Sequence, residues 1–118
     1  MDISGRHEEA GEYLMVAAAV AATIDSNRLR DVGGMGFSTS HGQPTLENTL
    51  SVSADAVSAL PIVPPGPVVA ERGEFYEEPA IGIDPAFESG FKYVESIAER
   101  RTVEVAHHAA YAARELLL

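Results

Sequence analysis

The positions of the prolines constrain this chain more than any other feature of its sequence. Six of the seven prolines lie between residues 44 and 79, the seventh is Pro85, and none follows it. A proline inside a helix removes a backbone hydrogen bond and clashes with the preceding turn. Long helices are therefore expected in the N-terminal part of the chain and after Pro85.

The C-terminal stretch has the period of an amphipathic helix. Asp84 can cap its first turn, and Pro85 suits the first helical position. The apolar positions recur every three or four residues. They are Phe87, Phe91, Val94, Ala98, Val105, Ala109, Ala112 and Leu116. The pattern predicts one long helix over about 85–116, with a break near Arg100–Thr102 as the alternative.

A second helix is predicted over about residues 7–24, with residue 32 as its furthest end. Its first turn is acidic, which suits the positive end of the helix dipole, and the run from Tyr13 to Ile24 is apolar except for Thr23. Gly33–Gly36 would stop it. Twelve apolar residues are too few to span a bilayer, which needs about 20.

No secretory signal is recognisable at the start of the sequence. Arg6 is followed by three glutamates, whereas a signal peptide begins with a basic region. The protein is therefore expected to be soluble, intracellular or within a particle, with its precise location undetermined.

Residues 37–83 predict an extended, proline-rich middle with short strands in about 46–83. Apolar residues alternate from Leu46 to Ala56, which favours a strand at about 48–54, although a helical pattern through Leu46, Leu50 and Val57 competes. The predicted fold is α+β: an N-terminal helix, a β-rich middle and a long C-terminal helix. All three are expected in one domain over residues 1–118.

Charge and cysteine content exclude several classes of function. The 18 acids and 8 bases give a net charge of −10, which disfavours nucleic-acid binding because phosphate contacts need a basic face. Cysteine is absent, so disulfides and thiol catalysis are excluded. No cofactor is expected.

The length of the C-terminal helix favours a role in assembly. A helix over 85–116 would measure about 48 Å, whereas a compact chain of this size is about 35 Å across. Its end would then pack on another subunit. The expected interface residues are Phe91, Val94, Val105, Ala109, Ala112, Leu116, Leu117 and Leu118. The leading hypothesis is a non-enzymatic structural subunit of an oligomeric particle, such as a virion or connector ring, that binds protein partners or itself.

Two alternatives remain open. Glu104 and His107 have the Glu-x-x-His spacing of di-metal helix bundles, although a complete site needs further ligands and surface histidines are common. The acids between Glu71 and Glu78 could instead dock a basic partner.

Overall fold

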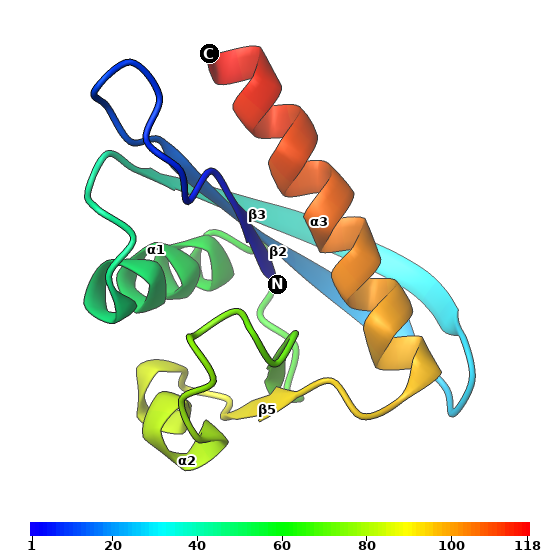
Figure 1. Cartoon of the computed structure of the whole chain (residues 1–118). Coiled ribbons are helices and arrows are strands. Elements are labelled where there is room, and N and C mark those ends of the chain that lie inside the picture. Colours follow the sequence, from blue (N-terminus) through cyan, green and yellow to red (C-terminus); the bar gives the residue numbers. More distant parts are fainter.

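A computed structural model describes residues 1–118 and shows an α+β chain that begins with strands (Figure 1). The first sheet is antiparallel in the order β1–β2–β3, with β1 (Asp2–Ser4), β2 (Met15–Ile24) and β3 (Leu29–Ser40). The remaining elements are α1 (Leu46–Ser58), β4 (Val68–Ala70), α2 (Ala80–Ile83), the 3-10 helix η1 (Asp84–Ala86), β5 (Phe91–Tyr93) and α3 (Ile97–Leu117). Strands β4 and β5 form a second, parallel pair.

The helix predicted over residues 7–24, and onward to 32, is wrong, because this part of the chain contains β2 and the start of β3. Strand β2 lies in the middle of its sheet, and helices α1 and α3 both pack against it. Residues Met15–Ala19 are consequently buried on both faces. A strand covered on both sides reads as a continuous apolar run without alternation, which periodicity alone cannot tell from a buried helix.

The glycines expected to stop a helix lie inside β3. Gly36 pairs with Ala19 of β2 and faces α1. A Cβ at this position would lie only 2.3 Å from the carbonyl oxygen of Ala56. Glycine is therefore what allows α1 to approach the sheet this closely.

The strand predicted at about 48–54 is also wrong, and the competing helical pattern is correct. Thr45 caps α1 by accepting a hydrogen bond from the Asn48 amide (3.1 Å). The buried hydroxyls of Thr49 and Ser53 donate to carbonyl oxygens one turn earlier in the same helix. These polar side chains are satisfied within the helix, so their alternation with apolar residues did not indicate an exposed strand face.

The single helix predicted over 85–116 is wrong for residues 85–96, which contain the end of η1, a turn and β5. The alternative break near Arg100–Thr102 is also wrong, because α3 is continuous there. Gly90 has a φ of +87°, a conformation that ends helical structure. Helix α3 begins only after Ser96, which forms a reciprocal capping box with Glu99. Its 21 residues measure about 31 Å, which is shorter than the 43 Å long axis of the molecule. The argument that the helix overhangs its own domain therefore fails.

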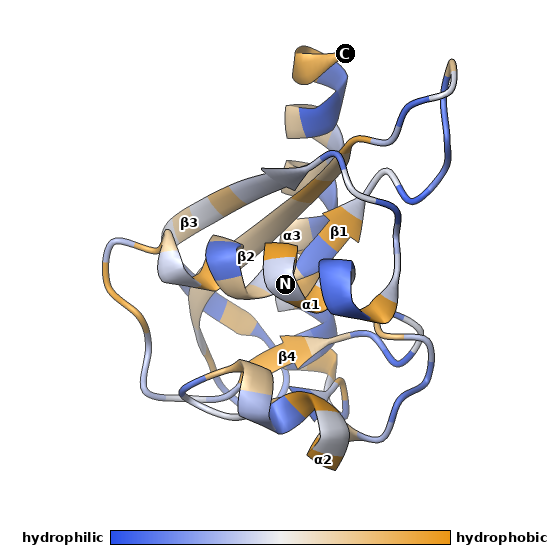
Figure 2. Cartoon of the chain, turned by 90° about the vertical axis from the view of Figure 1, so that its left-hand side faces the viewer, coloured by the Kyte–Doolittle hydropathy of each residue, from blue (hydrophilic) through white to orange (hydrophobic).

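Two apolar layers hold the fold together. The layer on the α1 side of the sheet contains a cluster of aromatic rings, with centroids 4.9–6.4 Å apart: Phe75, Phe87, Phe91 and Tyr93. On the other side, α3 lies along β2 and β1. Figure 2 shows the strongly apolar last turn of α3 extending beyond the sheet. None of the helices combines the length and apolar character needed to cross a membrane.

Candidate functional site

The first residues of the chain are hydrogen-bonded to the segment that contains β4 and Glu74. The Met1 amine donates to the Val69 carbonyl oxygen (2.8 Å), and further along both segments the Ile3 amide donates to Oε1 of Glu74 (2.9 Å). β1 belongs to the three-stranded sheet and β4 to the two-stranded pair, so these two bonds join one sheet to the other.

A carboxylate–histidine pair occupies this region. Asp2 is in β1 and points to the α3 side, because the neighbouring Ile3 packs into the core on the α1 side. Oδ2 of Asp2 lies 3.1 Å from Nδ1 of His107 in α3. The Asp2 side chain is 10% exposed and the His107 side chain is 60% exposed. The Asp2 carboxylate can accept a proton carried on Nδ1, and in that tautomer Nε2 of the imidazole is a free acceptor.

Glu74 lies beside this pair. Its Oε1 accepts hydrogen bonds from the Ile3 amide and from Nη2 of Arg6 (2.8 Å). Arg6 also donates to the Glu74 carbonyl oxygen (2.6 Å) and to the hydroxyl of Tyr76 (3.0 Å). Tyr76 and Glu77 both have positive φ angles, 56° and 60°. This unusual backbone costs about 1 kcal/mol or more per residue and makes the turn that brings Glu74 inward.

The two carboxyls affect each other's protonation. Burial raises the pKa of Asp2, and the hydrogen bond and charge of His107 partly oppose this shift. Burial and then the charge of Asp2 raise the pKa of Glu74 to about 7, against the effect of Arg6. Two adjacent buried carboxyls resist ionising together. Because His107 favours the charged form of Asp2, the proton that the pair retains near neutral pH belongs mainly on Glu74.

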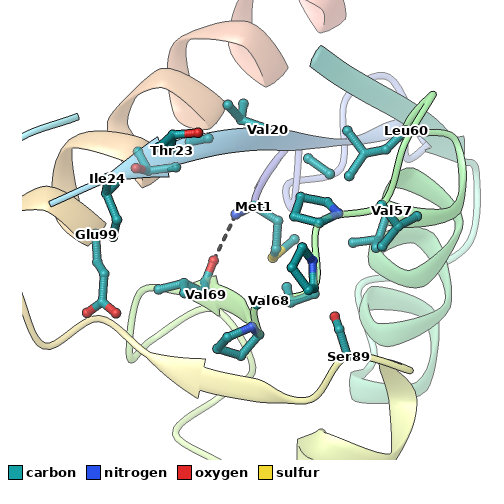
Figure 3. A pocket seen from close by; sticks show the side chains of 18 residues that line it. Met1, Val20, Thr23, Ile24, Val57, Leu60, Val68, Val69, Ser89 and Glu99 are labelled. Atoms are coloured by element: carbon teal, nitrogen blue, oxygen red, sulfur yellow. Dashed lines mark hydrogen bonds between the residues drawn. The ribbon is translucent and has the colours of Figure 1, made fainter. Parts of the chain in front are cut away.

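A second feature of the same region is a slot of about 430 Å³ between β2 and β4 (Figure 3). One wall is the last part of β2, including Val20 and Ile24, and the opposite wall is Val68 and Val69 of β4. The remaining sides come from α1, the first turns of α3 and the proline-rich residues 63–67. Met1 lies among the lining residues, and its amine donates to the Val69 carbonyl oxygen (Figure 3). The lining is mostly apolar.

The structure separates the residues of the predicted Glu-x-x-His motif. His107 contacts Asp2, whereas Glu104 pairs with Arg101 (3.0 Å) on the outer face of α3. The His108 ring lies 5.5 Å from the His107 ring. No group of three or more histidine, aspartate or glutamate side chains is arranged to hold a metal ion.

The predicted interface residues fall into three groups. Phe91 and Val94 are buried inside the chain, and Val105 and Ala109 are half-buried along α3. The exposed ones are Ala112, Leu116, Leu117 and Leu118. Only this last group is fully available to a partner.

The acids between Glu71 and Glu78 do not form one surface. Glu74 is buried with Arg6, and Glu71 pairs with Arg100 of α3 (3.1 Å). Glu77 and Glu78 remain exposed. The segment consists of turns and contains no strand beyond β4.

Sequence reasoning missed Asp2 and Arg6 as site residues and placed Glu74 in an exposed cluster. One signal was available: Asp2 is an acid next to Ile3 at the beginning of what proves to be a buried strand. This signal could have been used only if the N-terminal region had been predicted to form strands.

Fold and site together define a small α+β protein with a carboxylate–histidine pair between its first strand and its last helix. Along residues 1–118 the chain matches the family described as "Uncharacterized protein conserved in archaea (DUF2209)", and it belongs to that family. No curated protein and no solved structure matches it.

Proposed function

We propose that this protein is an acid–base enzyme in which His107 is the general base. The observation that carries the proposal is the 3.1 Å contact between an almost buried Asp2 carboxylate and the Nδ1 of a largely exposed His107. A buried carboxylate holds an imidazole in one orientation and tautomer and stabilises the imidazolium that forms during proton transfer. Asp2 is therefore a positioning residue, and the free Nε2 of His107 is the group that meets substrate.

Hydrolysis by water is the reaction that this arrangement supports best. Nε2 of His107 takes a proton from water while the water oxygen attacks the carbonyl or phosphoryl centre of an ester. The imidazolium then returns the proton to the leaving alcohol, so that the products are an acid and an alcohol. No serine or threonine hydroxyl is hydrogen-bonded to His107, and the chain has no cysteine, which favours water over a protein nucleophile.

The raised pKa values of Asp2 and Glu74 support the proposal that this cluster is an active site. Burial of two neighbouring carboxyls is costly, and clusters with raised pKa values concentrate at active sites.

Hydrolysis of 4-nitrophenyl acetate, 4-nitrophenyl phosphate and bis(4-nitrophenyl) phosphate tests the proposal. Any exposed imidazole accelerates the hydrolysis of an activated ester, so His108→Gln is the matched control for His107→Gln. We expect His107→Gln to lose on the order of 100-fold in kcat/KM on at least one substrate, and His108→Gln to keep the wild-type rate. Asp2→Asn should lower kcat and shift its pH profile while the circular dichroism spectrum stays unchanged. Equal rates in the two histidine variants on all three substrates would contradict the proposal.

Self-association is a second candidate function, in line with the hypothesis of an assembly subunit. Its support is the exposure of Leu116, Leu117 and Leu118, at 86%, 58% and 62%, on a helix end that extends beyond the sheet (Figure 2). An apolar patch of this kind is typical of contact surfaces. Size exclusion with light scattering should give a mass above 12.5 kDa, reduced to that of the monomer in Leu117→Glu. A monomeric wild-type protein at micromolar concentration would count against it.

A further inference from the structure

Strand β2 is paired along only part of one edge. On one edge of β2, β1 pairs with Val16–Ala18 only. On the other edge, β3 pairs with β2 along its whole length. No other backbone or side-chain hydrogen bond reaches Ala19–Ile24 on the β1 side. In an antiparallel strand, every second residue directs its N–H and C=O to each edge. The uncovered part of β2 therefore presents unpaired donors and acceptors.

The slot of about 430 Å³ lies along this uncovered edge, because most of residues 19–24 line it. Met1, which also lines the slot, already occupies the position of a strand residue between two neighbours. The register places it beside Ala19, one step before the Asp2–Ala18 pair, and its amine donates to Val69 of β4. The spacing at Met1 thus suits one strand between β2 and β4.

We propose that the slot binds an extended segment of a partner protein, which adds a strand between β2 and β4 in continuation of β1. Such a strand satisfies the free edge of β2 through main-chain hydrogen bonds, and pockets for alternate side chains supply specificity. A small apolar molecule would fill the slot but leave these backbone groups unpaired, which costs free energy when they are removed from water.

The residues on the two sides of the slot predict the order of apolar and polar residues in the bound segment. Val57 and Leu60, on the α1 side, make an apolar surface. On the α3 side, Thr102 and Glu99 contribute polar groups. Because successive side chains of a strand point to opposite faces, the segment should alternate apolar and polar residues.

A strand attached to the chain itself provides the first test. Val-Thr-Val-Thr added directly before Met1, after an initiating methionine, places both valines on the α1 side and both threonines on the α3 side. Thr-Val-Thr-Val has the same composition but reverses the two faces, so it is the matched control. We expect amide hydrogen exchange of Ala19–Ile24 to slow by on the order of 10-fold in the first protein relative to the second, and its Tm to rise by several degrees. Equal exchange in both proteins would overturn the proposal.

Binding from solution is tested on the unextended chain with the peptide acetyl-Val-Thr-Val-Thr-amide and its twin N-methylated at alternate residues. In ¹⁵N–¹H spectra, the peptide should shift the amides of β2 residues 19–24 and of Val68 and Val69, and the methylated twin should not. Identical shifts from both peptides mean that main-chain pairing is not involved, and they contradict the proposal. Absence of shifts from either peptide at millimolar concentration also contradicts it.

Discussion

Oδ2 of Asp2 lies 3.1 Å from Nδ1 of His107, although the two residues are 105 positions apart in the chain. This contact joins the first strand to the last helix, on the face of the sheet that α3 covers. It also joins a nearly buried group to an exposed one. The contact thus places an exposed imidazole against a carboxyl group held inside the protein.

The raised pKa of Glu74 predicts an unusual dependence of stability on pH. Its folded pKa of about 7 exceeds its ordinary value of 4.5, so the folded state binds the proton more tightly than the unfolded state. The free energy of unfolding should therefore fall as pH rises from about 4.5 to 7, by up to about 3 kcal/mol from this group. Glu74→Gln should flatten this slope in urea titrations between pH 5 and 8. The exposed Glu77→Gln is the control, and a Glu74→Gln slope parallel to wild type would refute the assignment.

Removal of the Arg6 side chain should lower the free energy of unfolding more at high pH than at low pH. Arg6→Met removes the 2.8 Å ion pair of the buried Glu74. At pH 8 this leaves a buried carboxylate without its partner, at a cost of about 3 kcal/mol. At pH 5 Glu74 is protonated and the cost should be smaller. Arg28→Met, which breaks an exposed pair with Asp25, should cost less than about 1 kcal/mol at either pH. If Arg6→Met lowered the free energy of unfolding by the same large amount at pH 5 and at pH 8, this would contradict the protonation of Glu74 at the lower pH.

Two glycines of β3 should respond very differently to alanine. In Gly36→Ala the new Cβ would lie 2.3 Å from the Ala56 oxygen and 2.9 Å from the Leu60 nitrogen, which are backbone atoms of α1 and its end. Relief of this overlap requires the helix to move, so we expect a loss of about 2–3 kcal/mol. Gly33→Ala meets no atom closer than 3.9 Å and should stay within about 0.5 kcal/mol of wild type. Chemical denaturation measures both; similar values would show that α1 does not pack against Gly36.

The capping box of α3 should contribute measurably to stability. Ser96→Ala removes the side-chain acceptor of the Glu99 amide (3.1 Å) and should cost about 1 kcal/mol. Ser51→Ala, at an exposed position of α1 without side-chain hydrogen bonds, is the matched control and should be nearly neutral. If both changes were neutral, α3 would begin elsewhere than at Ser96.

The class of fold could be predicted from the sequence, but the order of its elements could not. The helix after residue 97 was predicted correctly, but its buried face was not. That face contains Ala98, Val103, Ala106 and Ala110, whereas the predicted stripe beyond Ala98 is half-buried or exposed. The same stripe continued backward through Phe87 and Phe91, whose rings instead pack in the aromatic cluster around Phe75. Spacing alone does not distinguish a helix face from residues that meet in a core by way of turns.

The alanine-rich run of β2 was wrongly predicted to be helical for a different physical reason. Alanine favours helices, but this preference is small per residue and tertiary pairing overrides it. Small side chains at Ala17, Ala18 and Ala19 let helices approach the sheet from both sides. In a single sequence, a strand buried in this way looks the same as a helix.

The candidate site could be predicted only in part. His107 was singled out by its spacing from Glu104, but its partner is Asp2, which no local pattern connects to it. Glu74 looked like one of several surface acids, and its burial depends on the turn at Tyr76 and Glu77. Long-range contacts of this kind follow from strand order, which the sequence patterns did not reveal.

The boundary between β1 and β4 has a consequence for how the molecule opens. Beside the backbone bond from Met1 to Val69, the Glu74 carboxylate takes the place of a strand partner for Ile3. Residues 61–96 are thus attached to β1 by few main-chain bonds, and they are held mainly by side chains such as Phe75, Phe87 and Phe91, which pack in one core with Met1 and Ile3. Movement of this segment away from β1 would have to separate these rings as well, so the boundary should open only together with the core.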